Sequence, residues 1–275
     1  MSTLHLSTGV GDVLARCRAE GRAALIGYLP VGYPSVEGSI EAMVAMVEAG
    51  VDIVEVGVPY SDPVMDGPLI QAAAAAALEA GTRVDDVFTA TAAVREAGAP
   101  PIPMTYWNVV LRRGVERFAA DLAAAGGAGL ITPDLIPDEA GDWVAASDAH
   151  GLDRVFLVAP VSTDERLAVV TAACRGFVYA ASTMGVTGVR STVGGGAAEL
   201  FARTRAATDL PVCVGLGVST REQAAEVASY ADGVIVGSAL VRCLAEAREL
   251  SEGLDALRSL TAELAAGVRQ RHPNT

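Results

Sequence analysis

Short apolar runs alternate with longer amphipathic segments along nearly the whole chain. The short runs are rich in Val, Ile and Leu, as in strands that are covered on both faces of a parallel sheet. The longer segments repeat apolar residues every three to four positions, which indicates one buried helix face. The pattern predicts strands at residues 23–31, 51–58, 101–107, 129–132, 154–159, 177–181, 211–216 and 233–236.

Helical periodicity fills the intervals between these strands. Predicted helices cover residues 36–49, 69–80, 84–97, 112–125, 137–150, 163–175, 197–207, 220–229, 239–250 and 254–270, and a further helix at 9–21 precedes the first strand. Eight strand–helix units in a chain of 275 residues predict an α/β fold, a (β/α)8 TIM barrel with an extra N-terminal helix. A doubly wound open sheet is the competing fold, but no GxGxxG motif follows the first strand. We therefore expect one catalytic domain over residues 1–275.

One carboxylate interrupts the second predicted strand. Glu55 lies in an otherwise apolar run, and alternation places it on the same face as Ile53. Asp66 follows in a turn that Pro59, Pro63 and Pro68 make stiff, because proline fixes φ. Barrel enzymes carry their chemistry at the carboxyl ends of the strands, so this pair of acids is the candidate catalytic centre. The structural alternative is a buried glutamate that a polar neighbour satisfies, but the second acid on a rigid loop favours a site.

Glycine-rich segments follow the last three predicted strands, at residues 185–188, 215–217 and 237–238. Barrels frequently bind phosphate at the loops after strands seven and eight, because glycine lets the backbone approach and a helix N-terminus supplies N–H donors. Each glycine alone is typical of a turn, but three such segments in succession favour a phosphate site. The first belongs to a long loop at 182–196 that we predict to be a lid. Three tyrosines also fall at strand ends, where they either pack in the barrel or line a pocket: Tyr28, Tyr106 and Tyr179.

The charge balance and the absence of lysine narrow the possible chemistry. The chain has 33 acidic and 20 basic residues, a net charge of -13, which disfavours nucleic acid and anionic membranes as partners. All basic residues are arginine. Schiff-base aldolases, lysine-linked pyridoxal phosphate enzymes and P-loop NTPases each require a lysine, so these classes are excluded.

Four scattered cysteines and three scattered histidines show no metal-ligand spacing, so we expect no metal site. The chain shows no signal peptide and no membrane-length apolar run, so we expect a cytoplasmic protein. From the residues alone we predict a barrel enzyme that acts on a phosphorylated small molecule by carboxylate acid/base chemistry.

The run EVGVPYSDPVMDGP at residues 55–68 carries a resemblance to a known family. Together with GVTG at 185–188, GLG at 215–217 and GS at 237–238, it resembles the α-subunit family of tryptophan synthase, in order and over nearly the whole chain. The resemblance implies a lyase that cleaves indole-3-glycerol phosphate to indole and glyceraldehyde 3-phosphate by a retro-aldol reaction.

The resemblance also implies roles for individual residues. Glu55 matches the general acid/base, and Asp66 matches the acid that meets the indole N–H. The positions that match the substrate pocket, the lid and the phosphate grip are Tyr28, Tyr179, Thr187, Gly188, Gly217, Gly237 and Ser238. No cofactor is expected in this chain.

A partner follows from the same resemblance. Asp62, Pro63 and Asn108 match segments that face a β subunit. Family members form an αββα heterotetramer in which indole passes through a tunnel to pyridoxal phosphate in β. Two alternatives stay open: another phosphate-binding barrel, such as an isomerase of the same pathway, or a barrel that chiefly docks on and activates β. The ring-closing synthase barrel of that pathway would need a catalytic lysine, which this chain lacks.

Overall fold

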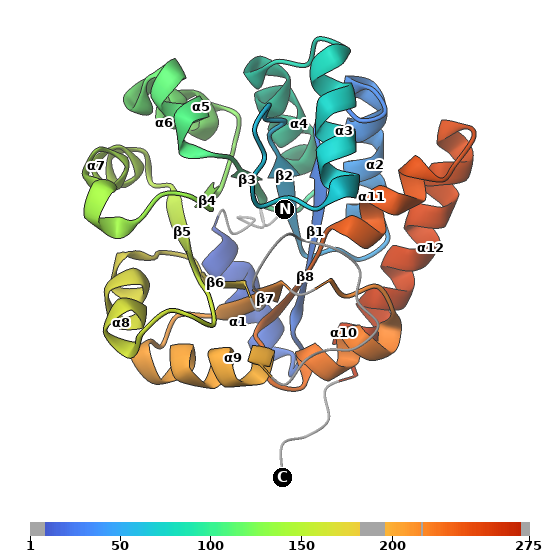
Figure 1. Cartoon of the computed structure of the whole chain (residues 1–275). Helices are drawn as coiled ribbons and strands as arrows, with labels where there is room; N and C mark the ends of the chain where they lie inside the picture. The colour runs from blue at the N-terminus through green and yellow to red at the C-terminus, as the bar shows by residue number, and fades with distance from the viewer. Residues whose placement is uncertain (1–8, 182–195, 216, 271–275) are drawn as a thin grey trace, which may run out of the picture.

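Parallel strands pair edge to edge and close into a barrel, as the sequence predicts (Figure 1). The structure is a computed structural model that describes residues 9–181, 196–215 and 217–270. Each strand pairs with the next along the chain, and β8 returns to pair with β1. The strands are β1 (Ala24–Pro30), β2 (Ile53–Gly57), β3 (Pro101–Met104), β4 (Gly129–Thr132), β5 (Asp153–Val158), β6 (Val178–Ala181), β7 (Val212–Gly215) and β8 (Gly233–Val236).

Helices surround the barrel and cover the outer faces of its strands (Figure 1). Their buried stripes of Ala, Val and Leu pack against the outward side chains of the strands, such as Val54 and Val56. The helices are α1 (Val10–Ala19), α2 (Val36–Glu48), α3 (Pro68–Glu79), α4 (Val84–Glu96), α5 (Trp107–Arg113), α6 (Val115–Ala124), α7 (Gly141–His150), α8 (Asp164–Ala173), α9 (Gly196–Ala207), α10 (Arg221–Ala228), α11 (Ser238–Ala245) and α12 (Leu250–Val268).

The predicted N-terminal helix, α1, closes the end of the barrel where the strands begin. Val13 and Leu14 of α1 share a buried cluster with the inward-facing Ile26 and Ile53. The N–H of Val10 donates a hydrogen bond to the Asp153 carboxylate, 3.3 Å away at the start of β5. Because this end is plugged with apolar side chains, a ligand reaches the barrel interior from the opposite, carboxyl end.

The barrel interior changes from apolar to polar along its axis. Ile26 pairs with Ile53, and two residues further along the strands Tyr28 pairs with Glu55. Alternation along a strand points both pairs inward. The lower level, with Ile26 and Ile53, packs on α1. The upper level, with Tyr28 and Glu55, brings a phenol and a carboxyl group to the mouth of the barrel, the end where the strands stop.

Four predicted element boundaries are wrong. The helix predicted at 137–150 begins at Gly141, after a short 3-10 helix at Pro137–Glu139. The third strand ends at Met104 rather than at residue 107, because α5 already begins at Trp107. The helix predicted at 112–125 is two helices, since Gly114 adopts a φ of 93°, which a continuing helix does not allow. The helix predicted at 239–250 stops at Ala245, and the last helix begins at Leu250.

Candidate active site

Glu55 lies on β2 and points into the barrel, near the carboxyl ends of the strands. The sequence predicts this direction, because Glu55 lies two residues after Ile53 and shares its face of the strand. Its side chain is buried, with 1 % of its surface exposed. Among the residues that the structure describes, none forms a hydrogen bond to its Oε2 atom. Burial, reinforced by the negative charge of Asp66, raises the pKa of Glu55 to about 8. A carboxyl group in this state holds a proton at neutral pH and can release it.

Asp66 lies on the loop between β2 and α3, close enough to Glu55 for its charge to act on it. The loop is tied together by hydrogen bonds from Val64 N–H to Asp62 O and from Asp66 N–H to Pro63 O. The Gln71 side chain on α3 donates to the Asp66 carbonyl at 2.8 Å. Burial raises the pKa of Asp66 to about 6. The structure therefore brings together the two acids that the sequence singles out.

Tyr28 and Tyr179 complete the wall of the mouth, and strand glycines make room for both rings. A Cβ atom on Gly57 would lie 2.6 Å from the Tyr28 hydroxyl, and one on Gly215 would lie 2.7 Å from the Tyr179 hydroxyl. Burial raises the pKa of each phenol well above its ordinary value, and the charge of Glu55 adds to this in both. The two tyrosines therefore stay neutral and present flat, partly apolar surfaces beside the carboxyl groups.

The candidate phosphate site lies at the ends of β7 and β8. Gly217 has a φ of 75°, a left-handed conformation that favours glycine. Gly237 precedes α11, and its carbonyl accepts hydrogen bonds from Leu240 and Val241 N–H. Ser238 is the first residue of α11 and is buried. The first N–H groups of a helix have no partner inside it and carry positive potential, so this end of α11 suits an anion. Thr187 and Gly188 lie outside the described residues.

The residues predicted to face a partner lie at the rim of the same mouth. Asp62 and Asn108 are exposed, and Pro63, which follows Asp62 on the loop after β2, is half-buried. The Asn108 side chain donates to the Tyr60 hydroxyl at 3.3 Å, which joins the α5 end of the rim to the β2 loop.

Comparison with known proteins decides the family. A family model described as "Tryptophan synthase alpha chain" matches residues 14–269. The protein of that name from Mycobacterium marinum is 65% identical over 263 residues, which cover 96% of each chain. The chain belongs to the tryptophan synthase alpha chain family. It is therefore a lyase of tryptophan biosynthesis, as its sequence predicts.

Solved structures agree with this assignment. A structure of Mycobacterium tuberculosis tryptophan synthase matches with a TM-score of 0.89 and 63% identity, over 94% of this chain and 98% of that one. The tryptophan synthase subunit alpha of Legionella pneumophila matches with a TM-score of 0.86 at 31% identity, over 94% and 97% of the two chains. The barrel is thus shared by relatives whose sequences have diverged widely.

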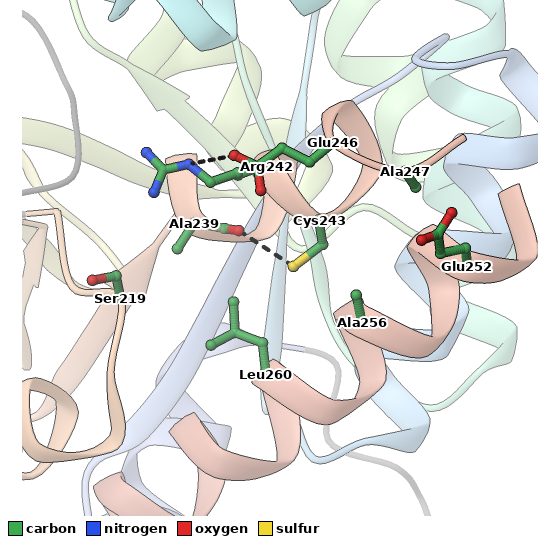
Figure 2. A pocket seen from close by; sticks show the side chains of 9 residues that line it. All are labelled: Ser219, Ala239, Arg242, Cys243, Glu246, Ala247, Glu252, Ala256 and Leu260. Atoms are coloured by element: carbon green, nitrogen blue, oxygen red, sulfur yellow. Dashed lines mark hydrogen bonds and ion pairs between the residues drawn. The ribbon is translucent and has the colours of Figure 1, made fainter. Parts of the chain in front are cut away.

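A second cavity, of about 390 Å³, lies behind α11, between it and α12 (Figure 2). Arg242 and Glu246 line it and form an ion pair with each other, with 3.7 Å between Nε and Oε1. Glu252, across the cavity, accepts a hydrogen bond from Arg248 N–H. The Arg242 guanidinium is thus already paired, and two carboxylates line the cavity, which does not suit an anionic ligand such as a phosphate. None of the described helices is long and apolar enough to span a membrane.

Sequence reasoning missed how Gly57 and Tyr106 serve the site. Gly57 is flanked by valines, and its signal was an isolated glycine within a strand, which often marks a close approach. The sequence identifies Tyr106 only as an aromatic residue at a strand end. Its hydroxyl accepts a hydrogen bond from Met65 N–H, the residue before Asp66, at 3.0 Å. No local sequence pattern predicts the contact between Tyr106 and Met65, because these residues lie 41 positions apart.

Proposed function

We propose that this chain cleaves indole-3-glycerol phosphate to indole and glyceraldehyde 3-phosphate. The observation that carries the proposal is the buried Glu55 carboxyl group, with an unpartnered Oε2 among the described residues and with Asp66 beside it. Between pH values of about 6 and about 8, the pKa values of the two groups leave Asp66 ionised and Glu55 protonated. The proposed reaction needs one acid in each of these states.

Glu55 acts as the general acid and then as the general base. It first gives its proton to C3 of the indole ring, and the ring nitrogen takes on positive character. As a carboxylate it then removes the proton from the side-chain hydroxyl next to the breaking bond. The oxygen electrons form the aldehyde, the C–C bond breaks, and its electrons return to the ring. A raised pKa suits both transfers, because the group is poised near neutral pH.

Asp66 stabilises the positive charge that develops on the indole nitrogen, by accepting a hydrogen bond from its N–H. A carboxylate held in place beforehand is more effective than water, because it does not have to reorient as the charge appears. Tyr28 and Tyr179 enclose the ring between flat surfaces.

The substrate phosphate binds at the carboxyl ends of the last strands. Gly217 supports the bend that brings the backbone close, and Gly237 and Ser238 place the N-terminus of α11 at the phosphate. Thr187 and Gly188 complete the proposed pocket as lid residues. These roles come from the family resemblance, and the left-handed φ of Gly217 supports them.

A tryptophan synthase β subunit is the proposed partner, in an αββα heterotetramer that passes indole to pyridoxal phosphate in β. Asp62, Pro63 and Asn108 would meet it at the rim. The loops after β2 and β5 also expose apolar side chains there, with Val64 75% and Val161 68% exposed. Exposed apolar groups around a site entrance suit a protein interface. The lysine that pyridoxal phosphate requires would come from β, since this chain contains none.

The decisive test is indole release from indole-3-glycerol phosphate by the purified chain, with and without an added β subunit. We expect slow release that rises strongly with β. Glu55→Gln should abolish release and keep the affinity for glycerol phosphate within a few-fold. Glu79→Gln, at an exposed glutamate at the end of α3, is the matched control and should keep full activity. Full turnover by Glu55→Gln would refute the acid/base role, and no release by the folded wild type under either condition would refute the reaction.

A further inference from the structure

The ring of Tyr106 stands at a fixed point on the rim of the barrel. Its neighbours are anchored on both sides: Thr105 N–H donates to the Ile131 carbonyl at 3.1 Å, and Trp107 N–H donates to the Asp134 carboxylate at 2.9 Å. Only 7% of the Tyr106 surface is exposed. These contacts bind the start of α5 to β4 and its following loop, so the Tyr106 side chain projects from the rigid part of the molecule.

The hydroxyl of Tyr106 connects this rigid part to the loop that carries Asp66. It accepts the Met65 N–H at 3.0 Å. The hydrogen bonds from Val64 N–H to Asp62 O and from Asp66 N–H to Pro63 O lie within the loop, and the Gln71 side chain joins the loop to the start of α3. The bond to Tyr106 joins this loop to the segment that follows the neighbouring strand β3, and it acts one residue away from the acid.

A second aromatic ring braces the first. Tyr60, at the start of the same loop, stacks on Tyr106 with 4.9 Å between ring centroids and an interplanar angle of 26°. The hydroxyl of Tyr60 in turn accepts a hydrogen bond from the Asn108 side chain. The loop is therefore held to the start of α5 at Tyr60 and again at Met65, on both sides of its outermost part.

We propose that Tyr106 is a positioning residue for Asp66, holding the loop through Met65 N–H while Tyr60 braces its ring. The proposal rests on the role proposed above for Asp66. A carboxylate can stabilise a developing charge only if it is held at the right place before the charge appears, and small displacements in such groups lower the rate. Tyr106 sets that place without touching the reacting atoms.

The hydroxyl can be removed while the ring remains. In Tyr106→Phe the stacking on Tyr60 persists and the Met65 N–H loses its acceptor. The loop then samples more open positions, in which Asp66 is better hydrated. We expect kcat for indole release to fall about five- to tenfold, as the loss of one hydrogen bond implies. KM should stay within about twofold, because the phosphate site is untouched.

Two further readouts separate positioning from a general loss of structure. Hydrogen exchange at the Met65 amide should become faster in Tyr106→Phe, since the bond that protects it is gone. The pKa of Asp66, followed by carboxyl NMR, should move down towards the ordinary aspartate value, because burial is what raises it. Tyr60→Leu should give the same changes in smaller measure, as it removes the brace and keeps the hydroxyl contact.

Tyr230→Phe is the matched control, because the Tyr230 hydroxyl is buried and has no hydrogen-bond partner among the described residues. It should keep wild-type kcat, Met65 exchange and Asp66 pKa. Wild-type kcat in Tyr106→Phe, or a raised KM with unchanged kcat, would overturn the positioning role. Asp66→Asn separates the proposed role of Asp66 from the positioning role of Tyr106. Full turnover in Asp66→Asn would refute the role of Asp66. An inactive Asp66→Asn together with a fully active Tyr106→Phe would refute only the positioning role of Tyr106.

Discussion

Glu55 should make the folded chain less stable as the pH rises, and Glu55→Gln should remove that dependence. Burial raises the pKa of Glu55 from its ordinary value of 4.5 to about 8. Below pH 4.5 the group is protonated in both the folded and the unfolded chain. Between 4.5 and about 8 the unfolded chain releases the proton while the folded chain retains it, so the free energy of unfolding falls. Above about 8 both states are ionised, and no further loss occurs.

The size of the effect follows from the same two values. A tenfold difference in proton affinity corresponds to about 1.4 kcal/mol, so the rise from 4.5 to about 8 corresponds to a loss of at most about 5 kcal/mol. Domains are stable by only about 5 to 15 kcal/mol, so this is a large fraction of the total. The glutamine amide has nearly the same shape and never ionises. Relative to wild type, Glu55→Gln should therefore gain stability as the pH rises.

Urea unfolding, followed by tryptophan fluorescence at several pH values from 4 to 9, measures this difference. Other groups also titrate, including Asp66, whose raised pKa acts in the same direction, and Asp148, whose pKa an ion pair with Arg154 lowers. Taking the difference between wild type and Glu55→Gln removes most of these shared contributions. A difference that stays constant from pH 4 to 9 would show that Glu55 is not held protonated in the folded state, and the acid/base argument would lose its physical basis.

Two glycine substitutions test the construction of the mouth. Gly217→Val should weaken glycerol phosphate binding by more than tenfold in calorimetry; Gly151→Val, at a left-handed glycine far from the mouth with a φ of 67°, should show a similar stability loss of about 1–3 kcal/mol but bind normally. Equal affinities in the two variants would rule out a phosphate site at Gly217. Gly57→Ala places a Cβ atom 2.6 Å from the Tyr28 hydroxyl, so it should displace that ring and lower kcat/KM for indole release. Unchanged kcat/KM would show that the position of Tyr28 does not matter.

The fold could be predicted because its signals repeat. Each strand is an apolar run, and each helix has a buried stripe, so eight weak indications support one another. The boundaries failed where a tertiary contact overrides the local pattern. The Trp107 N–H is capped by Asp134 from the next βα loop, and this starts a helix where the sequence still reads as strand. Gly114 divides a continuous helical pattern because its φ is 93°.

The sequence predicts those residues of the candidate site whose chemistry differs from that of their neighbours in the chain. Glu55 is conspicuous because it is a charge in a buried strand, and Gly217 lies among glycines that mark a close backbone approach. The sequence marks Tyr106 only as an aromatic residue at a strand end and does not mark Tyr60, because aromatic residues at a barrel rim are ordinary. The proposed role of these two tyrosines depends on the residues that they contact. These contacts join residues far apart in the sequence, so the closed barrel sets them and no local sequence pattern does.

The two acids show why the site needs both a strand and a loop. Glu55 must carry a proton near neutral pH, and deep burial is the main cause that keeps this carboxyl group in that state. A strand inside the barrel supplies such burial and cannot move. Asp66 must stay ionised, so it needs contact with water, which a loop at the rim allows, but a loop alone would leave it loosely placed. Its neighbour Met65 donates a hydrogen bond to the Tyr106 hydroxyl, and this contact holds the loop in one position while the acid stays at the rim.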